Sequence, residues 1–467
     1  MSRDESRIAP ARRLAHGVLL RVARDGAYAD RALDVALSRA RLSSRDRALA
    51  TELVYGTLRH QIFIDFVLGR LSNRPLRKTA VPVLAALRLG TYQLLETRVP
   101  RHAAVDETVA LARSKTPHAA GFANALMRKV ATLLDEGRLP DPTELYDDPL
   151  EALAVAGSHP LWILRELHAR YGKKRVAAWV EANNQRPPIS LRVNRLRARR
   201  DEIATMLTRD AGLTVETPSE FPDGLCVSPG GNVADWPGFN EGNYTVQDLA
   251  AQLVSCLAAP EPGAIVLDAC AAPGGKAIHL AELMQDRGLV LAVDVHNAKT
   301  RLIDAAAKRL GLSSVKALAA DASNPVALAD LLADAGHPAV SVAVVDAPCS
   351  GLGTLRRNPE LRLHDQKSVA RLCQLQDALL DSVATVVEPG GVLVYAVCTV
   401  TDAEGPQRLV RFLETHTDFE VEAPEEPLFA PFIETVDARG KAQPVVRTWT
   451  DRHGSDSFFV VKLRRSD

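Results

Sequence analysis

Short apolar runs alternate with helical stretches throughout the C-terminal half of the chain, and this alternation constrains the fold more than any other feature. Stretches with apolar residues every three or four positions, such as 276–285 and 298–311, separate the runs. Alternation of this kind is typical of βαβ units in a parallel sheet. From about residue 240 we therefore expect an α/β domain, with SFFVVKLRR (457–465) as its closing strand. The runs are AIVLD (264–268), LVLAVD (289–294), VKALA (315–319), VSVAVVD (340–346) and GVLVYAV (391–397).

Two cysteines stand just after two of these runs. Cys349 follows VVDAP, and Cys398 follows LVYAV. The carboxyl ends of parallel strands meet at the edge where open α/β sheets bind ligands, and neighbouring strands lie ~4.8 Å apart. We therefore expect the two sulfurs to face one substrate, where a thiol can act as a covalent nucleophile. A cysteine at a strand end is often only a small core residue, but the turn-forming neighbours of both residues favour the nucleophile.

The remaining cysteines indicate no metal site. None of the six cysteines forms a CxxC pair, so we expect neither a structural zinc nor any other bound metal. The N-terminal segment MSRDESRIAPARR has two acids and no apolar signal core, and no apolar run approaches the ~20 residues of a membrane span. A cytoplasmic protein in a reducing compartment is therefore expected. The cysteines without a paired setting are Cys226, Cys256, Cys270 and Cys373.

The segment CAAPGGK (270–276) after the first run is a candidate cofactor loop. It matches neither the G-x-G-x-x-G fingerprint nor a P-loop, but its small residues let a ligand approach the backbone. Asp294 ends the next run, 26 residues after Asp268, and an acid there commonly accepts hydrogen bonds from ribose hydroxyls. Asp321, after the third run, is placed to meet an adenine amino group. Because carboxylates repel a diphosphate, the set predicts a nucleoside without phosphates, and S-adenosylmethionine meets that requirement.

Residues 10–135 show helical spacing almost throughout and predict an all-α bundle. Ser44 and Asp106 are the expected helix N-caps, with breaks at 73–75 and 99–100. The whole chain is neutral, yet residues 1–130 hold 23 Lys and Arg against 11 Asp and Glu. This positive excess indicates a polyanionic partner, although a solvated charged surface would also explain it.

An acidic, proline-rich stretch at 135–149 is expected to be a linker to a small α+β domain. Within residues 155–235, strands are expected at PPISLRVN (187–194), LTVET (213–217) and GLCVS (224–228). Five arginines cluster at the exit of the first strand. They are expected either to contact nucleic acid or to form a solvated turn: Arg192, Arg195, Arg197, Arg199 and Arg200.

Three motifs carry a family resemblance. DACAAPGGK, DAPCSGLG and YAVCT, in this order and spacing, resemble the Nop2/Sun family of RNA 5-methylcytosine methyltransferases, and YTVQDLAAQL upstream is similar to a further motif of that family. RDRALATELVYGTLR, LRLGTYQLLETRVPRHAAVDETV and GFANALMRK resemble the NusB-like domain that precedes the catalytic part in bacterial small-subunit rRNA methyltransferases. The chain departs from the family pattern at Gly405, where asparagine or threonine is common, and at Ser457, where glycine is usual.

The resemblance implies roles for individual residues. Cys398 would add to carbon 6 of cytosine, Cys349 would assist release of the product, and Asp346 would bond the ring nitrogen. Lys276 would lower a thiol pKa from its free value of ~8.5, or would be only a surface charge. The implied cofactor site comprises Cys270, Ala271, Ala272, Pro273, Gly274, Gly275, Lys276, Asp294, Asp321 and Asp346.

We therefore expect three domains: a NusB-like helical RNA-binding domain (1–140), a small α+β domain (141–238), and a Rossmann-like class I methyltransferase domain dependent on S-adenosylmethionine (239–467). The expected reaction is methylation of carbon 5 of a cytosine in RNA, first of all 16S rRNA, by a monomer that acts on neither DNA nor membranes. A tRNA target remains open. An amino-group methyltransferase is disfavoured because DAPC lacks the proline pair and aromatic usual there. The first 135 residues also fit a non-catalytic RNA-binding or antitermination factor, which the cofactor loop and both cysteines disfavour.

Overall fold

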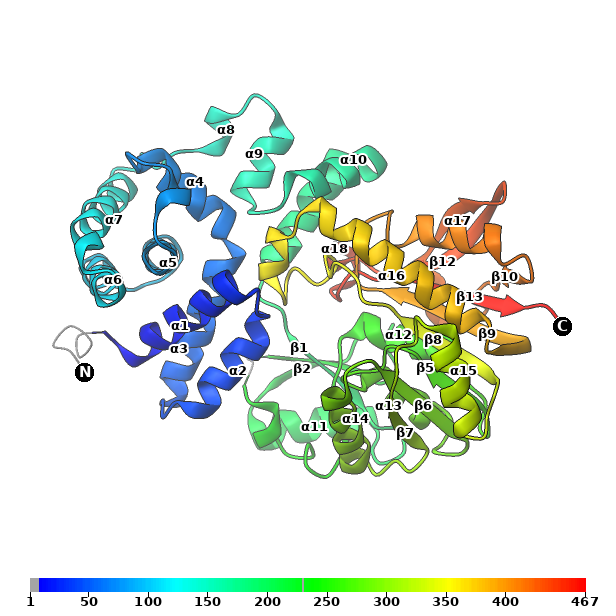
Figure 1. Ribbon diagram of the computed structural model, residues 1–467. Helices are drawn as coiled ribbons and strands as arrows, with labels where there is room; N and C mark the ends of the chain where they lie inside the picture. Colours follow the sequence, from blue (N-terminus) through cyan, green and yellow to red (C-terminus); the bar gives the residue numbers. More distant parts are fainter. Residues whose placement is uncertain (1–7, 229–230) are drawn as a thin grey trace. The chain divides into compact units, whose positions relative to one another are not determined.

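The computed structural model describes residues 8–228 and 231–467, so the expectation about the N-terminal segment falls largely outside the described residues. The chain forms two compact units (Figure 1). The helical unit runs to Gln185 and also includes Leu355–His364; the sheet unit comprises Arg186–Thr354 and Asp365–Asp467. In the described ranges, no helix is long and apolar enough to cross a membrane. The expected division into three domains at residues 140 and 238 stays a prediction.

A buried central helix organises the helical unit. Helix α5 (Val81–Glu96) packs against five other helices, and Ala86, Leu87 and Leu89 on it are fully buried. Figure 1 shows α5 enclosed by its neighbours. The bundle thus buries apolar positions at helical spacing, as the sequence pattern predicts. The other helices are α1 (Pro10–Asp25), α2 (Ala29–Arg39), α3 (Ser44–Arg59), α4 (Gln61–Leu71), α6 (Arg101–Lys115), α7 (Ala120–Asp135), α8 (Pro142–Leu145), α9 (Pro149–Ala156) and α10 (Leu161–Asn184).

The helix breaks fall where they were expected, but both N-cap predictions are wrong. Helices α4 and α5 end just before the breaks at 73–75 and 99–100. Ser43 rather than Ser44 caps α3, because its Oγ accepts the backbone N–H of Asp46 at 3.1 Å. Asp106 lies inside α6, which already begins at Arg101 because the preceding Pro100 has the fixed backbone angle that suits a helix start.

A segment distant in sequence, Leu355–His364, completes the helical unit. Arg362 on it is 2 % exposed and has no carboxylate partner among the residues that the structure describes. Its guanidinium instead donates to the carbonyl oxygens of Arg59 (2.7 Å), Ser158 (3.1 Å) and Asn183 (3.0 Å). These carbonyls lie at the C-terminal ends of α3, α9 and α10, where helix dipoles concentrate partial negative charge. Three helix ends therefore stabilise one buried cation, an anchor that was not predicted from the sequence.

The small sheet follows in the sheet unit. Its antiparallel strands run in the order β2 (Thr214–Glu216), β3 (Gly224–Ser228), β1 (Ile189–Val193) and β4 (Tyr244–Val246). Helix α11 (Arg200–Ala211) packs on this sheet and buries Leu207 against Leu191 and Leu225. The three strands expected from the sequence are confirmed, and β4 is an addition.

The large sheet has nine strands within the described residues. Five parallel strands form its core in the order β9 (Val387–Val397), β8 (Val340–Asp346), β5 (Ile265–Asp268), β6 (Leu289–Asp294) and β7 (Val315–Ala319). Antiparallel strands extend it beyond β9 in the order β13 (Phe459–Arg465), β12 (Lys441–Arg447) and β11 (Ile433–Ala438), while β10 (Phe419–Val421) pairs with β13. The expected parallel sheet and closing strand are confirmed.

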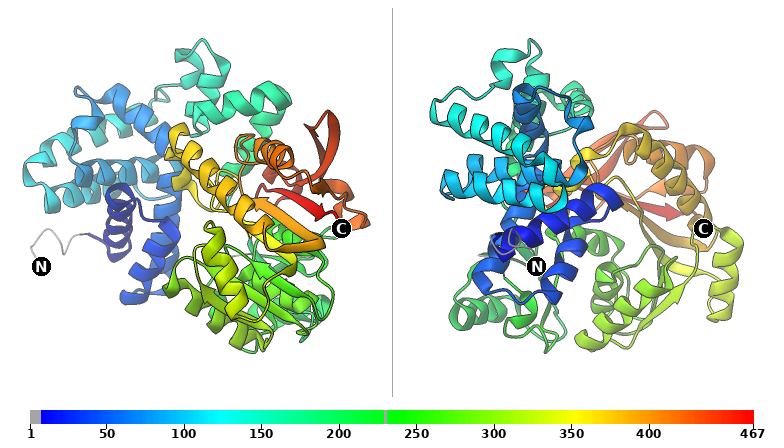
Figure 2. Two further views of the ribbon diagram at one scale, coloured as in Figure 1. Left: turned by 45° about the vertical axis from the view of Figure 1, so that its right-hand side comes forward. Right: turned by 60° about the vertical axis from the view of Figure 1, so that its left-hand side comes forward.

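Helices cover both faces of this sheet. Apolar residues of α12 (Leu249–Ala258), α13 (Gly275–Leu283) and α14 (Asn297–Leu310) form one buried cluster with the strands. Those of α15 (Pro325–Asp334), α16 (Gln366–Ala384) and α17 (Pro406–Thr415) contribute to the other. Figure 2 shows the sheet between these helix layers. This is the Rossmann-like α/β architecture expected from the sequence.

Candidate active site

The two cysteines that follow β8 and β9 lie in contact. The strands pair in parallel, with Asp346 opposite Ala396. The backbone N–H of Ala347 donates to the Ala396 carbonyl at 3.0 Å. The segments that follow β8 and β9 therefore leave the sheet side by side. The Sγ atoms of Cys349 and Cys398 are 3.2 Å apart, and both side chains are half-buried. The hydrogen bond with Cys398 and burial hold the pKa of the Cys349 thiol well above its ordinary value. The expectation that both sulfurs emerge at one edge of the sheet is confirmed.

A half-buried ion pair lies near the thiols. Lys276, on the first turn of α13, donates from Nζ to Asp346 Oδ2 at 2.5 Å. Burial opposes the charged form of Lys276, but the charge and hydrogen bond of Asp346 outweigh it and raise the lysine pKa. Cys398 adds a smaller contribution to the rise in the lysine pKa. Lys276 is therefore no surface charge; whether it lowers a thiol pKa stays a prediction.

Asp268, at the end of β5, is a third ionisable group of this cluster. It is fully buried, and burial raises the pKa of its carboxyl to about 7. The charge of Lys276 opposes this rise, whereas that of Asp346 adds to it. Perturbed carboxyl groups of this kind gather at functional sites. Asp268 was not among the site residues predicted from the sequence, although its place at a strand end was the signal that could have found it.

The candidate cofactor loop, residues 270–276, makes a tight turn between β5 and α13. Ala271 N–H donates to the Val293 carbonyl at 2.9 Å, and Gly274 N–H donates to the Ala271 carbonyl at 2.7 Å. Gly274 has φ +109°, and a Cβ there would lie 3.2 Å from the Cα of Ile303, so only glycine fits without strain. Cys270 and Ala272 are half-buried and Pro273 is exposed, while burial raises the pKa of the Cys270 thiol. A small-residue turn thus opens toward the same edge of the sheet.

The two acids predicted to meet the nucleoside follow neighbouring strands. Asp294 ends β6; its Oδ1 accepts His296 N–H at 2.9 Å, while among the described residues Oδ2 accepts no hydrogen bond. Asp321, after β7, is exposed, and its Oδ1 accepts from the hydroxyl and backbone N–H of Ser323. One edge of the sheet therefore carries, in order, the 270–276 turn, Asp294 and Asp321. Small residues and acceptor-only carboxylates in this order fit an adenosine-type cofactor such as S-adenosylmethionine.

The two departures from the family pattern both lie close to the start of β13. A Cβ on Gly405 would lie 2.9 Å from Cγ of Phe459, so a side chain here would displace that ring. Ser457, the other departure, donates its backbone N–H to the Gly353 carbonyl at 2.8 Å, and its own carbonyl would lie 1.9 Å from a Cβ on Gly353. These contacts pack the start of β13 against Gly405 and against the loop that carries Cys349.

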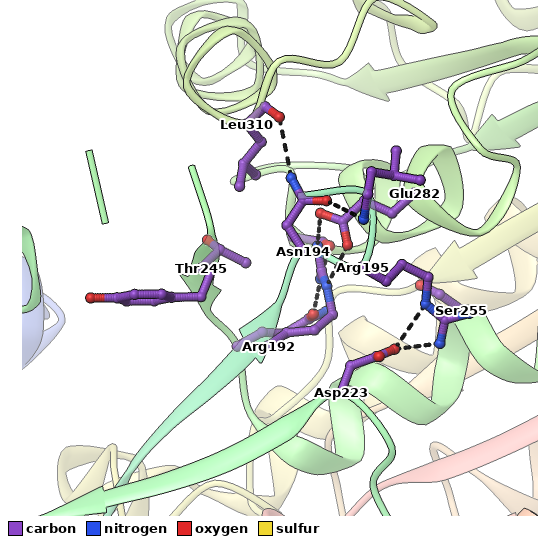
Figure 3. Close-up of polar contacts among 12 residues, drawn as sticks. Arg192, Asn194, Arg195, Asp223, Thr245, Ser255, Glu282 and Leu310 are labelled. Carbon is purple, nitrogen blue, oxygen red and sulfur yellow. Dashed lines mark hydrogen bonds and ion pairs between the residues drawn. The ribbon is translucent and has the colours of Figure 1, made fainter. Parts of the chain in front are cut away.

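The arginine cluster of the small sheet has mainly structural partners, and Figure 3 shows those of Arg192 and Arg195. Arg192 is buried; it pairs with Glu282 of α13 at 3.0 Å, donates to the Gly275 carbonyl at 2.9 Å and also bonds Gln247. Arg195 pairs with Asp223 at 2.5 Å. Arg197 and Arg200 donate to backbone carbonyls, and Arg199 is exposed. The nucleic-acid expectation is therefore wrong for Arg192, because its guanidinium is used inside the protein to tie β1 to the first turn of α13.

No group of three or more His, Cys, Asp or Glu side chains suited to holding a metal ion occurs within residues 8–228 and 231–467.

Fold and site together define a methyltransferase that uses S-adenosylmethionine. A family model described as 16S rRNA methyltransferase RsmB/F matches residues 255–464, a NusB family model matches 9–132, and a ferredoxin-like domain model of RsmF/B-like methyltransferases matches 159–234. The chain belongs to the RsmB/F methyltransferase family. The resemblance inferred from the motifs is thereby confirmed.

Relatives of similar length support this membership. A probable ribosomal RNA small subunit methyltransferase B of Synechocystis sp. is 34% identical over 98% of this chain and 99% of its own. A probable protein of the same name from Bacillus subtilis is 32% identical over 97% of this chain and 98% of its own. Among solved structures, PH0851 is 26% identical, with a TM-score of 0.81 over 98% of this chain and 99% of its own. The NSun6 structure from Pyrococcus horikoshii, 20% identical with a TM-score of 0.56 over 66% of this chain and 98% of its own, shares the fold.

Proposed function

We propose that the protein methylates carbon 5 of a cytosine in small-subunit ribosomal RNA through a covalent bond between cytosine and Cys398. The observation that carries this proposal is the 3.2 Å contact between the Cys349 and Cys398 sulfurs beside the Lys276–Asp346 pair. A single strand-end thiol fits many roles. Two thiols in contact at the ligand edge of the sheet, next to a carboxylate and a cation, fit addition to a base and its later release.

Three observations support RNA as the substrate. The relatives that span nearly the whole chain carry the name ribosomal RNA small subunit methyltransferase B. A NusB family model matches residues 9–132. The first 130 residues also carry 23 basic against 11 acidic side chains, which suits a phosphate backbone. A cytosine must leave its stack to reach thiols at a sheet edge, so an unpaired or extruded base is the expected substrate.

The chemistry divides between the two thiols. The Cys398 thiolate adds to carbon 6, forming a C–S bond, and the electrons of the C5–C6 double bond move into the ring and make carbon 5 nucleophilic. Asp346 would accept a hydrogen bond from a proton on ring nitrogen 3, which favours this electron shift. Carbon 5 then takes the methyl group, whose bond to the sulfonium sulfur breaks. A water molecule takes the proton on carbon 5, the C5–C6 double bond forms again, and the C–S bond breaks to release Cys398. Cys349, which stays protonated because its pKa is raised, assists this release by giving its proton to the departing Cys398 sulfur, 3.2 Å from its own.

The cofactor supplies an electrophilic methyl group on a sulfonium. The chain's own residues would hold it: the 270–276 turn would allow close approach to the backbone, Asp294 would accept from the ribose hydroxyls, and Asp321 would bond the adenine. Lys276 would keep Asp346 in place through their hydrogen bond.

Trapping the covalent adduct tests this proposal. Cys398→Ala should abolish methyl transfer and leave no protein–RNA adduct, whereas Cys349→Ala should accumulate an adduct that survives denaturation, because addition proceeds while release stalls. Cys226→Ala, on β3 of the small sheet, is the matched control and should behave like the wild type. An adduct in the Cys398 variant that is missing in the Cys349 variant would show that the roles are reversed. Methylation by both variants at the wild-type rate would refute the cysteine mechanism.

Mapping the modified base identifies the target. Bisulfite sequencing of total RNA from a strain lacking this protein should show the loss of one 5-methylcytosine in small-subunit rRNA. Loss of a site in tRNA would move the substrate to tRNA. No transfer of labelled methyl to any RNA would favour a non-catalytic binding factor.

A further inference from the structure

Glu404 is a fully buried carboxylate outside the groups assigned to the cofactor and to the cytosine. It lies six residues after Cys398, just before α17, and its side chain is 0 % exposed. Among the described residues it forms no ion pair with a lysine, arginine or histidine. Burying a charged carboxylate costs folding free energy unless other groups stabilise the charge. Hydrogen-bond donors around Glu404 must therefore supply this stabilisation.

Five donors converge on the two oxygens of Glu404. Oε1 accepts the backbone N–H of Ser350 at 2.7 Å and the side-chain amide of Gln376 at 3.2 Å. Oε2 accepts the hydroxyls of Ser350 at 2.6 Å, Thr399 at 2.9 Å and Thr401 at 2.9 Å. Charge-assisted hydrogen bonds of this kind are about twice as strong as neutral ones. One carboxylate thus gathers groups from three separate segments of the chain.

Two of these donors stand directly beside the thiols. Ser350 follows Cys349, and Thr399 follows Cys398. Their hydroxyl oxygens also lie 2.9 Å from each other, so the two loops meet at Glu404 as well as at the sulfurs. Gln376 extends the contact, because its amide donates both to Glu404 and to the carbonyl of Pro348, the residue before Cys349.

We propose that Glu404 is a positioning residue that holds the Cys349 and Cys398 loops together and so sets the separation of the two thiols. This deepens the proposed function and rests on it for the roles of the cysteines. Without the carboxylate, Ser350 N–H would lose its acceptor in a dry site, and the two loops would have to move apart to find others. When the carboxylate is present, neither loop can shift without breaking charge-assisted hydrogen bonds to Glu404.

The charge of Glu404 has a second consequence. It adds to the rise in the pKa of the Cys349 thiol, after the larger effects of the Cys398 hydrogen bond and burial. Glu404 therefore favours the protonated form of the thiol that assists release.

Disulfide formation between the thiols measures their separation without RNA. Diamide takes two electrons and two protons from the thiols, giving a disulfide and a hydrazine, and peptide mass spectrometry reports the Cys349–Cys398 link. Glu404→Ala should slow this reaction by about tenfold or more, since a lost charged hydrogen bond is worth ~1.5–3 kcal/mol. Glu404→Gln should restore most of the rate, because its oxygen can face the two N–H donors while the hydroxyls turn to accept its amide. Glu414→Gln, an exposed neighbour on α17, is the matched control.

Methyl transfer and thiol titration complete the test. Glu404→Ala should lower kcat by about 10- to 100-fold with unchanged affinity for S-adenosylmethionine, and Glu404→Gln should recover part of it. In Glu404→Gln, the pH midpoint for alkylation of Cys349 should also fall. A folded Ala variant with wild-type disulfide formation and wild-type kcat would overturn the proposal, and so would a Gln variant that is no faster than Ala in forming the disulfide.

A second variant keeps the proposal testable if the Glu404→Ala protein does not fold. Ser350→Ala combined with Thr399→Val removes one hydroxyl from each loop and leaves Glu404 intact. Slower disulfide formation with normal cofactor binding would support the proposal, and an unchanged rate would overturn it. Because the disulfide assay needs no RNA, it also separates the two proposals: methylation that survives Cys398→Ala refutes the cysteine chemistry, while the positioning role is decided by the disulfide rates alone.

Discussion

Lys276 Nζ and Asp346 Oδ2 lie 2.5 Å apart, although 70 residues separate them in the chain. The pair joins the first turn after the cofactor loop to the end of the strand that leads to Cys349. It is shielded, with side-chain exposures of 12% and 27%. The Lys276–Asp346 ion pair therefore links the cofactor loop to the strand that precedes Cys349.

This pairing predicts strongly non-additive mutations. Asp346→Asn and Lys276→Met should each lower kcat/KM by roughly tenfold to a hundredfold, since a hydrogen bond to a charged group is worth ~1.5–3 kcal/mol. The double variant should be little worse than Asp346→Asn alone, because the lysine acts through its partner. Single-turnover methylation with a double-mutant cycle measures this coupling. Additive losses would show that Lys276 acts independently of Asp346.

Asp294 should contribute to cofactor affinity. Its Oδ2 accepts no hydrogen bond among the described residues, and removing a charged acceptor for the ribose hydroxyls costs ~1.5–3 kcal/mol. Asp294→Ala should therefore weaken S-adenosylmethionine binding roughly tenfold to a hundredfold, as calorimetry can measure. Asp304→Ala, an exposed acid on α14, is the control. Unchanged affinity in Asp294→Ala would remove this residue from the site.

Exposed arginines of the helical unit should set the salt dependence of RNA binding. Arg39, Arg41 and Arg45 lie around the turn between α2 and α3, and all three are exposed. Each substitution by glutamine that removes a phosphate contact should shallow the log–log slope of affinity against salt by roughly 0.7–0.9. Arg138→Gln, which removes the exposed partner of Glu136, is the control. An unaltered slope in the triple variant would exclude this surface as the RNA contact.

Substitutions are preferable to an N-terminal deletion for this purpose. Glu360 accepts the backbone N–H of Ala29 at 2.9 Å, and Arg362 donates to the carbonyl of Arg59. Deleting the first 140 residues would leave these two buried side chains of the 355–364 segment without those partners. Any loss of RNA binding would then be confounded by unfolding.

The raised pKa of Asp268 predicts that the stability difference between the wild type and Asp268→Asn depends on pH. Its folded pKa of about 7 lies above the ordinary value of 3.8, so the folded state holds a proton that the unfolded state has lost between these pH values. The stability contribution of this group is therefore present below pH ~4 and declines as pH rises toward 7. The melting temperature of Asp268→Asn relative to the wild type should rise from pH 5 to pH 7.5, whereas Asp304→Asn should show no such trend. A pH-independent difference would contradict the raised pKa.

Local patterns in the sequence determined the elements and the family. The apolar runs predicted the five parallel strands because a strand buried on both faces needs continuous apolar residues, and helical spacing predicted the N-terminal bundle. Cys349 and Cys398 could be placed at one edge because parallel strands end on the same side. The weakest local signals failed: Ser44 and Asp106 are not caps, and the short strands β10, β11 and β12 were not expected.

Only the tertiary structure decided which distant residues meet. Arg192 looked like one of five surface arginines, but its pairing with Glu282 depends on how β1 packs against α13. Arg362 is buried because three helix ends happen to converge on it. Glu404 gathers donors from segments up to 54 residues away. Burial and hydrogen bonding between remote segments follow from the packed fold, and spacing along the chain carries no information about them.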